Sequence, residues 1–283
     1  MAVFYNMATL SYNNTSVNSN IVSGEIRSQL NMTKNALSEY YTPGGTVTYV
    51  IGIVNPGNTA YSGVTLTDDL GAYTVGDRTF VPLDYVQGSL AYYVNGELTT
   101  TPVVNAGPPL VISGVDIPAN GNVVIIYQAV ANEFASPAAD GEITNTVTAS
   151  GACIGALSAS ETVTVQDSPR LIISKSLNPV IVEPNGRITY TFVISNLSAI
   201  PAVATDNLTV TDNFDPVLSD IVVTLNGEEL TEPGEYTYDE ASGAFATALS
   251  LITVPGATVV QNPETGEWTV TPGTAVLTVS GNI

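Results

Sequence analysis

The segment Pro43-Gly-Gly-Thr-Val-Thr-Tyr-Val-Ile-Gly-Ile-Val-Asn55 places apolar residues at every second position, between two turn signals. This alternation is typical of a β-strand with one buried face, and Pro-Gly pairs are typical of turns. The same pattern predicts strands at Thr46–Val54, Val64–Thr67, Val123–Val130, Ile143–Thr148, Arg187–Ile194, Asn207–Thr211 and Ala275–Val279. Asn-Gly pairs at 95–96, 185–186 and 226–227 lie between apolar stretches and predict type I′ hairpin turns. Because no window shows sustained helical periodicity, we expect an all-β chain of sandwich domains.

The composition excludes several classes of function. The 283-residue chain has a formal net charge of −20, which disfavours nucleic acid and anionic membranes as partners. It contains no histidine, so serine and cysteine hydrolase triads and His-liganded zinc are excluded. The single cysteine, Cys153, excludes an internal disulfide. No apolar run has the length of a membrane span, and we expect neither a cofactor nor a metal site.

The chain also repeats itself. Ser19–Asn55 and Ser160–Asn196 align without a gap, and the agreement continues after three extra residues in the second copy. The aligned pairs include Val22 with Val163, Leu30 with Leu171, Lys34 with Lys175, Thr48-Tyr49 with Thr189-Tyr190, and Leu66-Thr67-Asp68 with Val210-Thr211-Asp212. A repeat of this length indicates two homologous domains. We place them at residues 26–166 and 167–283, joined near Gln166–Pro169.

The two copies are not equally complete. In the first, Ile143–Thr148 and Glu161–Val165 are predicted to form the hairpin that closes the sandwich. In the second, only Ser280–Ile283 follows the corresponding strand, so the closing hairpin is missing. A segment of the missing type lies at the other end of the chain, where Phe4–Thr9 resembles Ile143–Thr148.

We therefore predict that residues 1–25 are donor strands that complete the second domain of the next subunit. An incomplete sandwich exposes backbone hydrogen-bonding groups, while a free hairpin is only marginally stable. Residues 26–30 lead directly into the first strand of domain one, which disfavours completion within one molecule. Head-to-tail completion between molecules does not close, so it produces a filament. The alternative is that both ends are cuts through a longer tandem array.

One lysine, one aspartate and one asparagine recur at equivalent positions. They are Lys34, Asp68 and Asn145 for domain one, and Lys175, Asp212 and the donor residue Asn6 for domain two. All alternate in phase with apolar neighbours, so we expect their side chains to face the core, and the same parity favours Asp68 over Asp69.

Burial favours a neutral amine and a protonated carboxylic acid. An amine held against an asparagine amide can form a Lys–Asn isopeptide bond and release ammonia, with the aspartic acid as proton relay. The noncovalent alternative is a Lys–Asp ion pair capped by the asparagine.

These residues also carry a family resemblance. The order of motifs resembles that of the conserved-repeat, immunoglobulin-like domains of bacterial surface proteins. The motifs are a lysine on the first strand, then Pro43–Tyr49, Thr67-Asp68 and Ile143–Thr148. The Lys/Asp/Asn placement is similar to that of isopeptide-forming modules in Gram-positive pili and adhesins. The resemblance covers nearly the whole chain. In domain two, Pro184-Asn185-Gly186-Arg187 departs from the Pro-Gly-Gly-Thr pattern, which affects a turn and leaves the three polar positions in place.

The resemblance implies a bond between Lys34 and Asn145 in domain one, with Asp68 as the proton relay. In domain two, which lacks its own asparagine, it implies a bond between Lys175 and Asn6 of the next subunit, with Asp212 as the relay.

We thus expect two tandem immunoglobulin-like sandwiches, the second incomplete, in a structural subunit of a self-assembling filament. Its partner would be a further copy of itself, and its only chemistry would be autocatalytic, so we do not expect an enzyme. We expect an extracellular, cell-surface or spore-surface location without a classical signal peptide, because the N-terminus lacks basic and apolar signal regions. The spore location rests on analogy with spore appendages. The alternative is a tandem adhesin that binds a host or matrix ligand.

Overall fold

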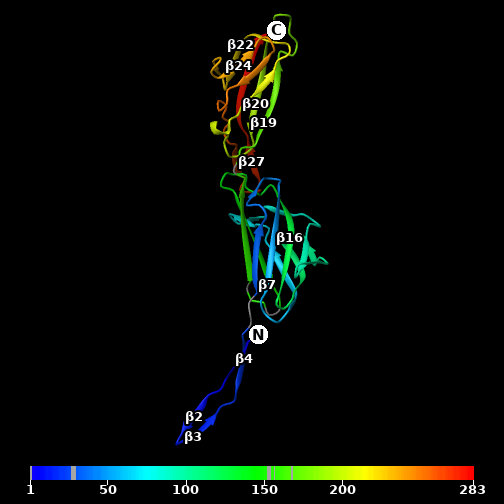
Figure 1. Cartoon of the computed structure of the whole chain (residues 1–283), viewed down its shortest axis with the longest axis vertical. Helices are drawn as coiled ribbons and strands as arrows, with labels where there is room; N and C mark the ends of the chain where they lie inside the picture. Colours follow the sequence, from blue (N-terminus) through cyan, green and yellow to red (C-terminus); the bar gives the residue numbers. More distant parts are fainter. Residues whose placement is uncertain (1, 27–29, 152–153, 156, 167) are drawn as a thin grey trace. The chain divides into compact units, whose positions relative to one another are not determined.

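The computed structural model describes residues 2–26, 30–151, 154–155, 157–166 and 168–283. Met1, Cys153 and part of the predicted junction at 166–169 lie outside these residues. Within them the chain is all-β apart from one 3-10 helix, η1 (Ala204–Asp206), which confirms the predicted fold class. No helix in this part of the chain is long and apolar enough to cross a membrane. Two compact units are present, Met1–Ser136 with Glu142–Thr164, and Pro137–Gly141 with Val165–Ile283 (Figure 1).

Unit one contains two six-stranded sheets. The first has the order β13-β12-β16-β7-β5, with β11 also paired to β16, and the second has the order β14-β15-β8-β17-β18-β6. The strands are β5 Asn31–Ala36, β6 Tyr40–Tyr41, β7 Thr46–Asn55, β8 Tyr61–Asp68, β11 Leu83–Tyr85, β12 Ala91–Val94, β13 Glu97–Thr99, β14 Val103–Asn105, β15 Leu110–Ile117, β16 Gly121–Ala131, β17 Glu142–Ser150 and β18 Leu157–Val165. A separate short ladder joins β9 (Tyr73–Val75) to β10 (Arg78–Phe80).

Strand β7 shows why this sequence forms a half-buried sheet. Val47, Tyr49, Ile51 and Ile53 are at most 1% exposed, while the residues between them are half-buried. The period-two pattern therefore places one face of the strand in the core. Burying each large apolar side chain stabilises the fold by roughly 1.5–3 kcal/mol.

The predicted closing hairpin of unit one is present. β17 and β18 pair in antiparallel register, with Asn145 opposite Glu161. β17 also pairs with β8, with Val147 opposite Asp68. Because β15 pairs with the other side of β8, that strand has a hydrogen-bonded neighbour on each edge.

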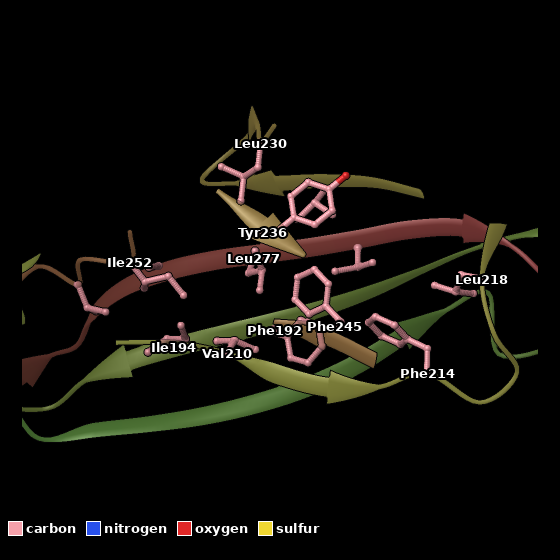
Figure 2. Packing of buried hydrophobic residues seen from close by; sticks show 14 of the residues in the cluster. Phe192, Ile194, Val210, Phe214, Leu218, Leu230, Tyr236, Phe245, Ile252 and Leu277 are labelled. Atoms are coloured by element: carbon pink, nitrogen blue, oxygen red, sulfur yellow. The ribbon is translucent and has the colours of Figure 1, made fainter. Parts of the chain in front are cut away.

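Unit two has a five-stranded sheet of order β19-β20-β28-β22-β23, a three-stranded sheet of order β21-β25-β24, and a β26-β27 ladder. The strands are β19 Leu171–Asn178, β20 Arg187–Asn196, β21 Thr211–Asn213, β22 Ser219–Leu225, β23 Glu228–Glu229, β24 Tyr236–Asp239, β25 Ala244–Thr247, β26 Thr258–Gln261, β27 Trp268–Thr271 and β28 Gly273–Asn282. Figure 2 shows the apolar core of this unit, in which Phe192, Phe214 and Phe245 are buried. The ring centroids of Phe214 and Phe245 are 5.8 Å apart.

The three-stranded sheet of unit two ends at β21. This strand pairs with β25, from Thr211 opposite Ala246 to Asn213 opposite Ala244, and with no other strand in the described part of the chain. The sequence repeat aligns β21 with the end of β8, which lies beside β17 in unit one. Unit two therefore has an unpaired strand edge where unit one has its closing hairpin.

Residues 2–26 form two short ladders of their own. These join β1 (Ala2–Asn6) to β4 (Val22–Ile26), and β2 (Thr9–Tyr12) to β3 (Thr15–Asn18). None of these four strands pairs with any other described strand. Every side chain from Phe4 to Ser23 is exposed, and Leu10 is 66% exposed. The segment therefore presents apolar side chains that nothing in the described chain buries.

The register of this segment differs from that of the closing hairpin. In the closing hairpin Asn145 lies opposite Glu161, and the sequence repeat aligns Glu161 with Asn20. The same register would place Asn6 opposite Asn20, but Asn6 lies opposite Val22. The shift is two residues, so each side chain keeps its face of the ribbon. A two-stranded ribbon without a buried face specifies its register weakly, which accounts for the difference.

The Asn-Gly turns divide into two kinds. Both residues have positive φ at 95–96 (52° and 84°) and 226–227 (52° and 89°), as type I′ turns require. The type I′ prediction for Asn185-Gly186 is wrong, because Asn185 has a φ of 60° while Gly186 is not in the positive-φ region. The Gly186 N–H donates to the carbonyl of Glu183. Pro184 therefore sits at the position that favours a type II turn.

The strand predicted at Asn207–Thr211 begins only at Thr211. Asn207 has a φ of 54° at the end of η1. The hydroxyl of Thr209 donates to the carbonyl of Thr247 (2.8 Å), and the Val210 N–H donates to the Thr247 hydroxyl (2.9 Å). Threonine hydroxyls compete with the backbone for hydrogen bonds, and here they replace a regular ladder.

Candidate cross-linking sites

Lys34 lies in the core of unit one. It is on β5 in phase with Leu30, and its side chain is fully buried. Its Nζ lies 2.5 Å from Oδ2 of Asp68, at the end of β8. The same Nζ donates to the Tyr127 hydroxyl at 3.1 Å and lies 4.9 Å from the centre of the Tyr49 ring. The predicted core-facing orientation of Lys34 and Asp68 is confirmed.

Asn145 completes this cluster through Tyr127. Its Nδ2 donates to the Tyr127 hydroxyl at 3.0 Å, and that hydroxyl donates to Asp68 Oδ2 at 2.7 Å. Asn145 is 0% exposed, and its Oδ1 accepts no hydrogen bond in the described part of the chain. The structure thus brings together the lysine, aspartate and asparagine predicted for domain one. The carbonyl oxygen left without a donor belongs to the amide that the predicted reaction would attack.

Burial shifts the pKa values of Lys34 and Tyr127 in opposite directions. Desolvation lowers the pKa of Lys34, although the Asp68 carboxylate opposes the change. Desolvation also raises the pKa of Tyr127 well above its usual range, and the nearby Asp68 acts in the same direction. A lysine with a lowered pKa supplies a neutral amine more readily, which is the nucleophilic form.

Asp68 and Asp69 have separate roles. Asp68 Oδ2 accepts from Lys34 and Tyr127, and its Oδ1 accepts from the Leu70 N–H at 3.1 Å. Asp69 instead accepts from the backbone N–H groups of Gly71 (2.9 Å) and Thr146 (2.8 Å). The parity argument for Asp68 is therefore consistent with the structure. Asp69, which follows β8, is hydrogen-bonded to the backbone of Thr146 on β17.

In unit two, Lys175 and Asp212 form an ion pair between Nζ and Oδ2. The Lys175 Nζ lies 4.5 Å from the ring centre of Tyr190 and 5.2 Å from that of Phe214. Among the described residues, neither charged side chain is hydrogen-bonded to an asparagine side chain. The pair is the counterpart of Lys34–Asp68 without the third member.

Burial distinguishes the two lysines. The Lys175 and Asp212 side chains are 40% and 19% exposed, against 0% for both Lys34 and Asp68. The predicted cover over Lys175 comes from the next subunit, so its burial in the filament stays a prediction. Its side chain lies over core aromatic rings as strand parity predicts, but no described strand occupies the position that β17 has in unit one.

Asn6 is the last residue of β1 and is exposed. It pairs with Val22 of β4. Its predicted approach to Lys175 is between molecules, so it stays a prediction.

Tyr127 was not predicted from the sequence. The signal was present, because Tyr127 alternates in phase with Val123 and Ile125 of a strand that was predicted. A tyrosine at such a position is usually a packing residue. Only the register of β16 against β7, which places Tyr127 opposite Tyr49, shows which polar groups its hydroxyl contacts.

A comparison with protein-family models gives no match, and neither does a comparison with curated proteins. Solved structures do match at low identity. BcpA, the major pilin subunit of Bacillus cereus, is 14% identical, with 96% of this chain and 73% of that chain covered and a TM-score of 0.36. The full-length major pilin SpaD from Corynebacterium diphtheriae is 11% identical, with 86% and 59% covered and a TM-score of 0.35.

The collagen-binding domain from a Staphylococcus aureus adhesin is 14% identical, with 50% of this chain and 99% of that domain covered and a TM-score of 0.32. These three structures are thus two pilins and one adhesin domain. At these identities and TM-scores none of the likenesses transfers a function to this chain.

Proposed function

We propose that this protein is the structural subunit of a surface or extracellular filament, in which residues 1–25 complete unit two of the next subunit. One contrast carries the proposal. In unit one, β8 is paired on both edges and Lys34 is fully buried. Among the described strands of unit two, the equivalent strand β21 pairs on one edge, with β25, and Lys175 is 40% exposed. A donated hairpin would supply the strand neighbour and the cover that unit two lacks.

The N-terminal segment suits this role chemically. It has no Asp, Glu, Lys or Arg between Met1 and Gly24, although the whole chain carries a net charge of −20. A charged side chain entering an apolar core would cost several kcal/mol, whereas this segment brings none. Phe4, Leu10 and Tyr12 are each more than half exposed, so docking would remove apolar surface from water.

The proposed junction chemistry uses residues of two subunits. The Lys175 ammonium gives one proton to the Asp212 carboxylate, and the neutral amine attacks the side-chain carbonyl carbon of the next subunit's Asn6. A second proton from the amine goes to the amide nitrogen, which leaves as ammonia. The products are a Lys–Asn amide bond, ammonia and a protonated Asp212, so charge and atoms balance. The same reaction at Lys34, Asp68 and Asn145 would cross-link unit one.

A ligand-binding role is the second candidate, and one observation favours it. Unit one has a surface pocket of about 430 Å³ whose lining includes Tyr61, Tyr92, Thr99 and Asp116. Pockets of about 300–1,000 Å³ commonly hold small ligands. An adhesin would retain binding after loss of the N-terminal segment, whereas a filament subunit would lose assembly.

The first test is boiled, reducing gel electrophoresis of the purified chain, together with electron microscopy of the native sample. We expect a ladder of subunit multiples that disappears in Asn6→Ala and in Lys175→Ala. Asn20→Ala is the matched control, since it removes another exposed asparagine of the same segment, and it should keep the ladder.

Removing residues 2–25 should give monomers without filaments. Filaments that persist after this deletion would overturn donor-strand assembly. Filaments of the intact chain that dissolve to a single band on boiling would leave the assembly in place and overturn the covalent junction.

A further inference from the structure

The Tyr127 hydroxyl lies at the centre of the unit-one cluster. It accepts from Lys34 Nζ at 3.1 Å and from Asn145 Nδ2 at 3.0 Å, and it donates to Asp68 Oδ2 at 2.7 Å. The side chain is 0% exposed and its ring stacks on that of Tyr49 at a centroid distance of 5.5 Å. It therefore contacts the nucleophile, the acid and the leaving nitrogen of the proposed reaction.

We propose that Tyr127 is a catalytic residue for the cross-link of unit one, and that its hydroxyl delivers the proton with which ammonia leaves Asn145. This inference rests on the proposed Lys34–Asn145 bond. Among the described residues no direct hydrogen bond joins Asp68 Oδ2 to Asn145, and the Tyr127 hydroxyl bridges the two side chains. A proton that Asp68 takes from Lys34 thus has a route to the leaving nitrogen through the tyrosine hydroxyl.

The steps balance in protons and bonds. Asp68 takes one proton from the Lys34 ammonium, and the amine attacks the Asn145 side-chain carbon, forming the new C–N bond. The amide nitrogen becomes an amine with a free lone pair, so it now accepts from Tyr127. Tyr127 gives its proton to this nitrogen and regains the second proton of the Lys34 nitrogen, either directly or through Asp68, which takes that proton as it passes its own to Tyr127. The old C–N bond breaks, ammonia leaves, and the site ends with a neutral tyrosine and a protonated Asp68.

The surroundings keep Tyr127 suited to this relay. Burial raises its pKa well above the usual range, and the adjacent Asp68 carboxylate acts in the same direction. The hydroxyl therefore stays protonated, and a protonated hydroxyl can accept one proton while it gives up another.

Unit two lacks this hydroxyl. In the sequence repeat, Tyr190 of unit two aligns with Tyr49 of unit one. Tyr127 lies opposite Tyr49 on the neighbouring strand, whereas Val279 lies opposite Tyr190. The junction site therefore has an alkyl side chain where unit one has the proton carrier. We expect the Lys34–Asn145 bond to form faster than the Lys175–Asn6 bond, so that a subunit closes its own cross-link before it is sealed to its neighbour.

The test follows ammonia loss by intact mass in the full chain carrying Asn6→Ala, so that only the bond of unit one is counted. The chain is made by cell-free translation, because a bond already formed in purified protein would survive denaturant, and samples are quenched in acid at increasing times after synthesis. Tyr127→Phe removes the hydroxyl and keeps the ring. Tyr41→Phe is the matched control, because its buried hydroxyl donates to the Ser136 carbonyl at 2.6 Å and to no member of the cluster.

We expect Tyr127→Phe to slow the mass loss by about 10²-fold or more, the usual contribution of a general acid, and Tyr41→Phe to leave the rate unchanged. Equal rates for Tyr127→Phe and the parent would overturn the role of Tyr127. A parent that never loses ammonia would overturn the proposed bond itself, which is a different result. If Tyr127→Phe does not fold, a fluorinated tyrosine of lower pKa at position 127 keeps the ring and hydroxyl. A rate that does not change with that substitution would equally overturn the relay.

Discussion

Removing the Asn145 side chain tests the cross-link of unit one through its stability. A Lys34–Asn145 bond closes a loop of roughly 110 residues, and a cross-link over such a loop stabilises a fold by about 5 kcal/mol at 25 °C by restricting the unfolded chain. Asn145 is also fully buried and hydrogen-bonded to Tyr127. Losing that hydrogen bond and its packing adds about 1–3 kcal/mol. We therefore expect Asn145→Ala to lower the free energy of unfolding of unit one by about 6–8 kcal/mol.

The assay is denaturant unfolding with two probes. The chain has one tryptophan, Trp268, and it lies on β27 of unit two, so its fluorescence follows that unit. Far-ultraviolet circular dichroism follows both units. We expect Asn145→Ala to move the transition of unit one to lower denaturant, while the Trp268 transition stays in place. Intact mass identifies the linked and unlinked chains in each sample.

Asn55→Ala is the control for loss of a buried asparagine. Asn55 is 1% exposed in the same sandwich, and its Nδ2 donates to the carbonyls of Thr59 and Pro118. Its replacement costs hydrogen bonds but no cross-link, so its effect should be the smaller by about 5 kcal/mol. An Asn145→Ala chain no less stable than Asn55→Ala would refute the loop-closure reasoning.

Two further predictions concern pH and salt. In Asn145→Ala the Lys34 amine is free, and its pKa is lowered in the folded state and has its ordinary value of 10.5 in the unfolded state. Between these two pKa values the unfolded state binds more protons than the folded state. The free energy of unfolding of this variant therefore rises with pH in that range. Above pH 10 the raised pKa of Tyr127 makes the free energy of unfolding fall again with pH. The cross-linked parent has no free Lys34 amine, so its denaturant unfolding should show no rise of stability with pH. Filament growth, followed by light scattering, should accelerate by about tenfold or more from about 10 to 100 mM salt, since screening weakens repulsion between subunits of charge −20. Growth that slows with added salt would contradict this prediction.

The strands could be predicted because their signal is local. Alternation of buried and exposed positions along β7 and β16 follows directly from the period of a strand. Prediction failed at Asn207–Thr211 and at the turn of Asn185, where a side-chain hydroxyl and a proline decide the backbone. Those effects depend on one or two neighbours that an alternation pattern does not weigh.

Alignment of the two repeats singled out the polar residues, and parity oriented them. Lys34 and Asp68 could be identified in this way because alternate residues of a strand point to the same face of the sheet, and aligned strands of the two repeats bury the same face. Burial could not be read from parity alone. Lys175 has the same phase as Lys34, yet it is 40% exposed, since burial depends on a strand that lies across from it.

From the sequence alone came the all-β class, the internal repeat, and the pairing of each lysine with an aspartate. These depend on residue order and period, which the chain carries along its length. Only the tertiary structure identified Tyr127 as the group that joins Lys34, Asp68 and Asn145, and showed that Asp69 accepts from backbone N–H groups. Those contacts link strands far apart in the chain, and their geometry is decided by the register of β16 on β7 and of β17 on β8.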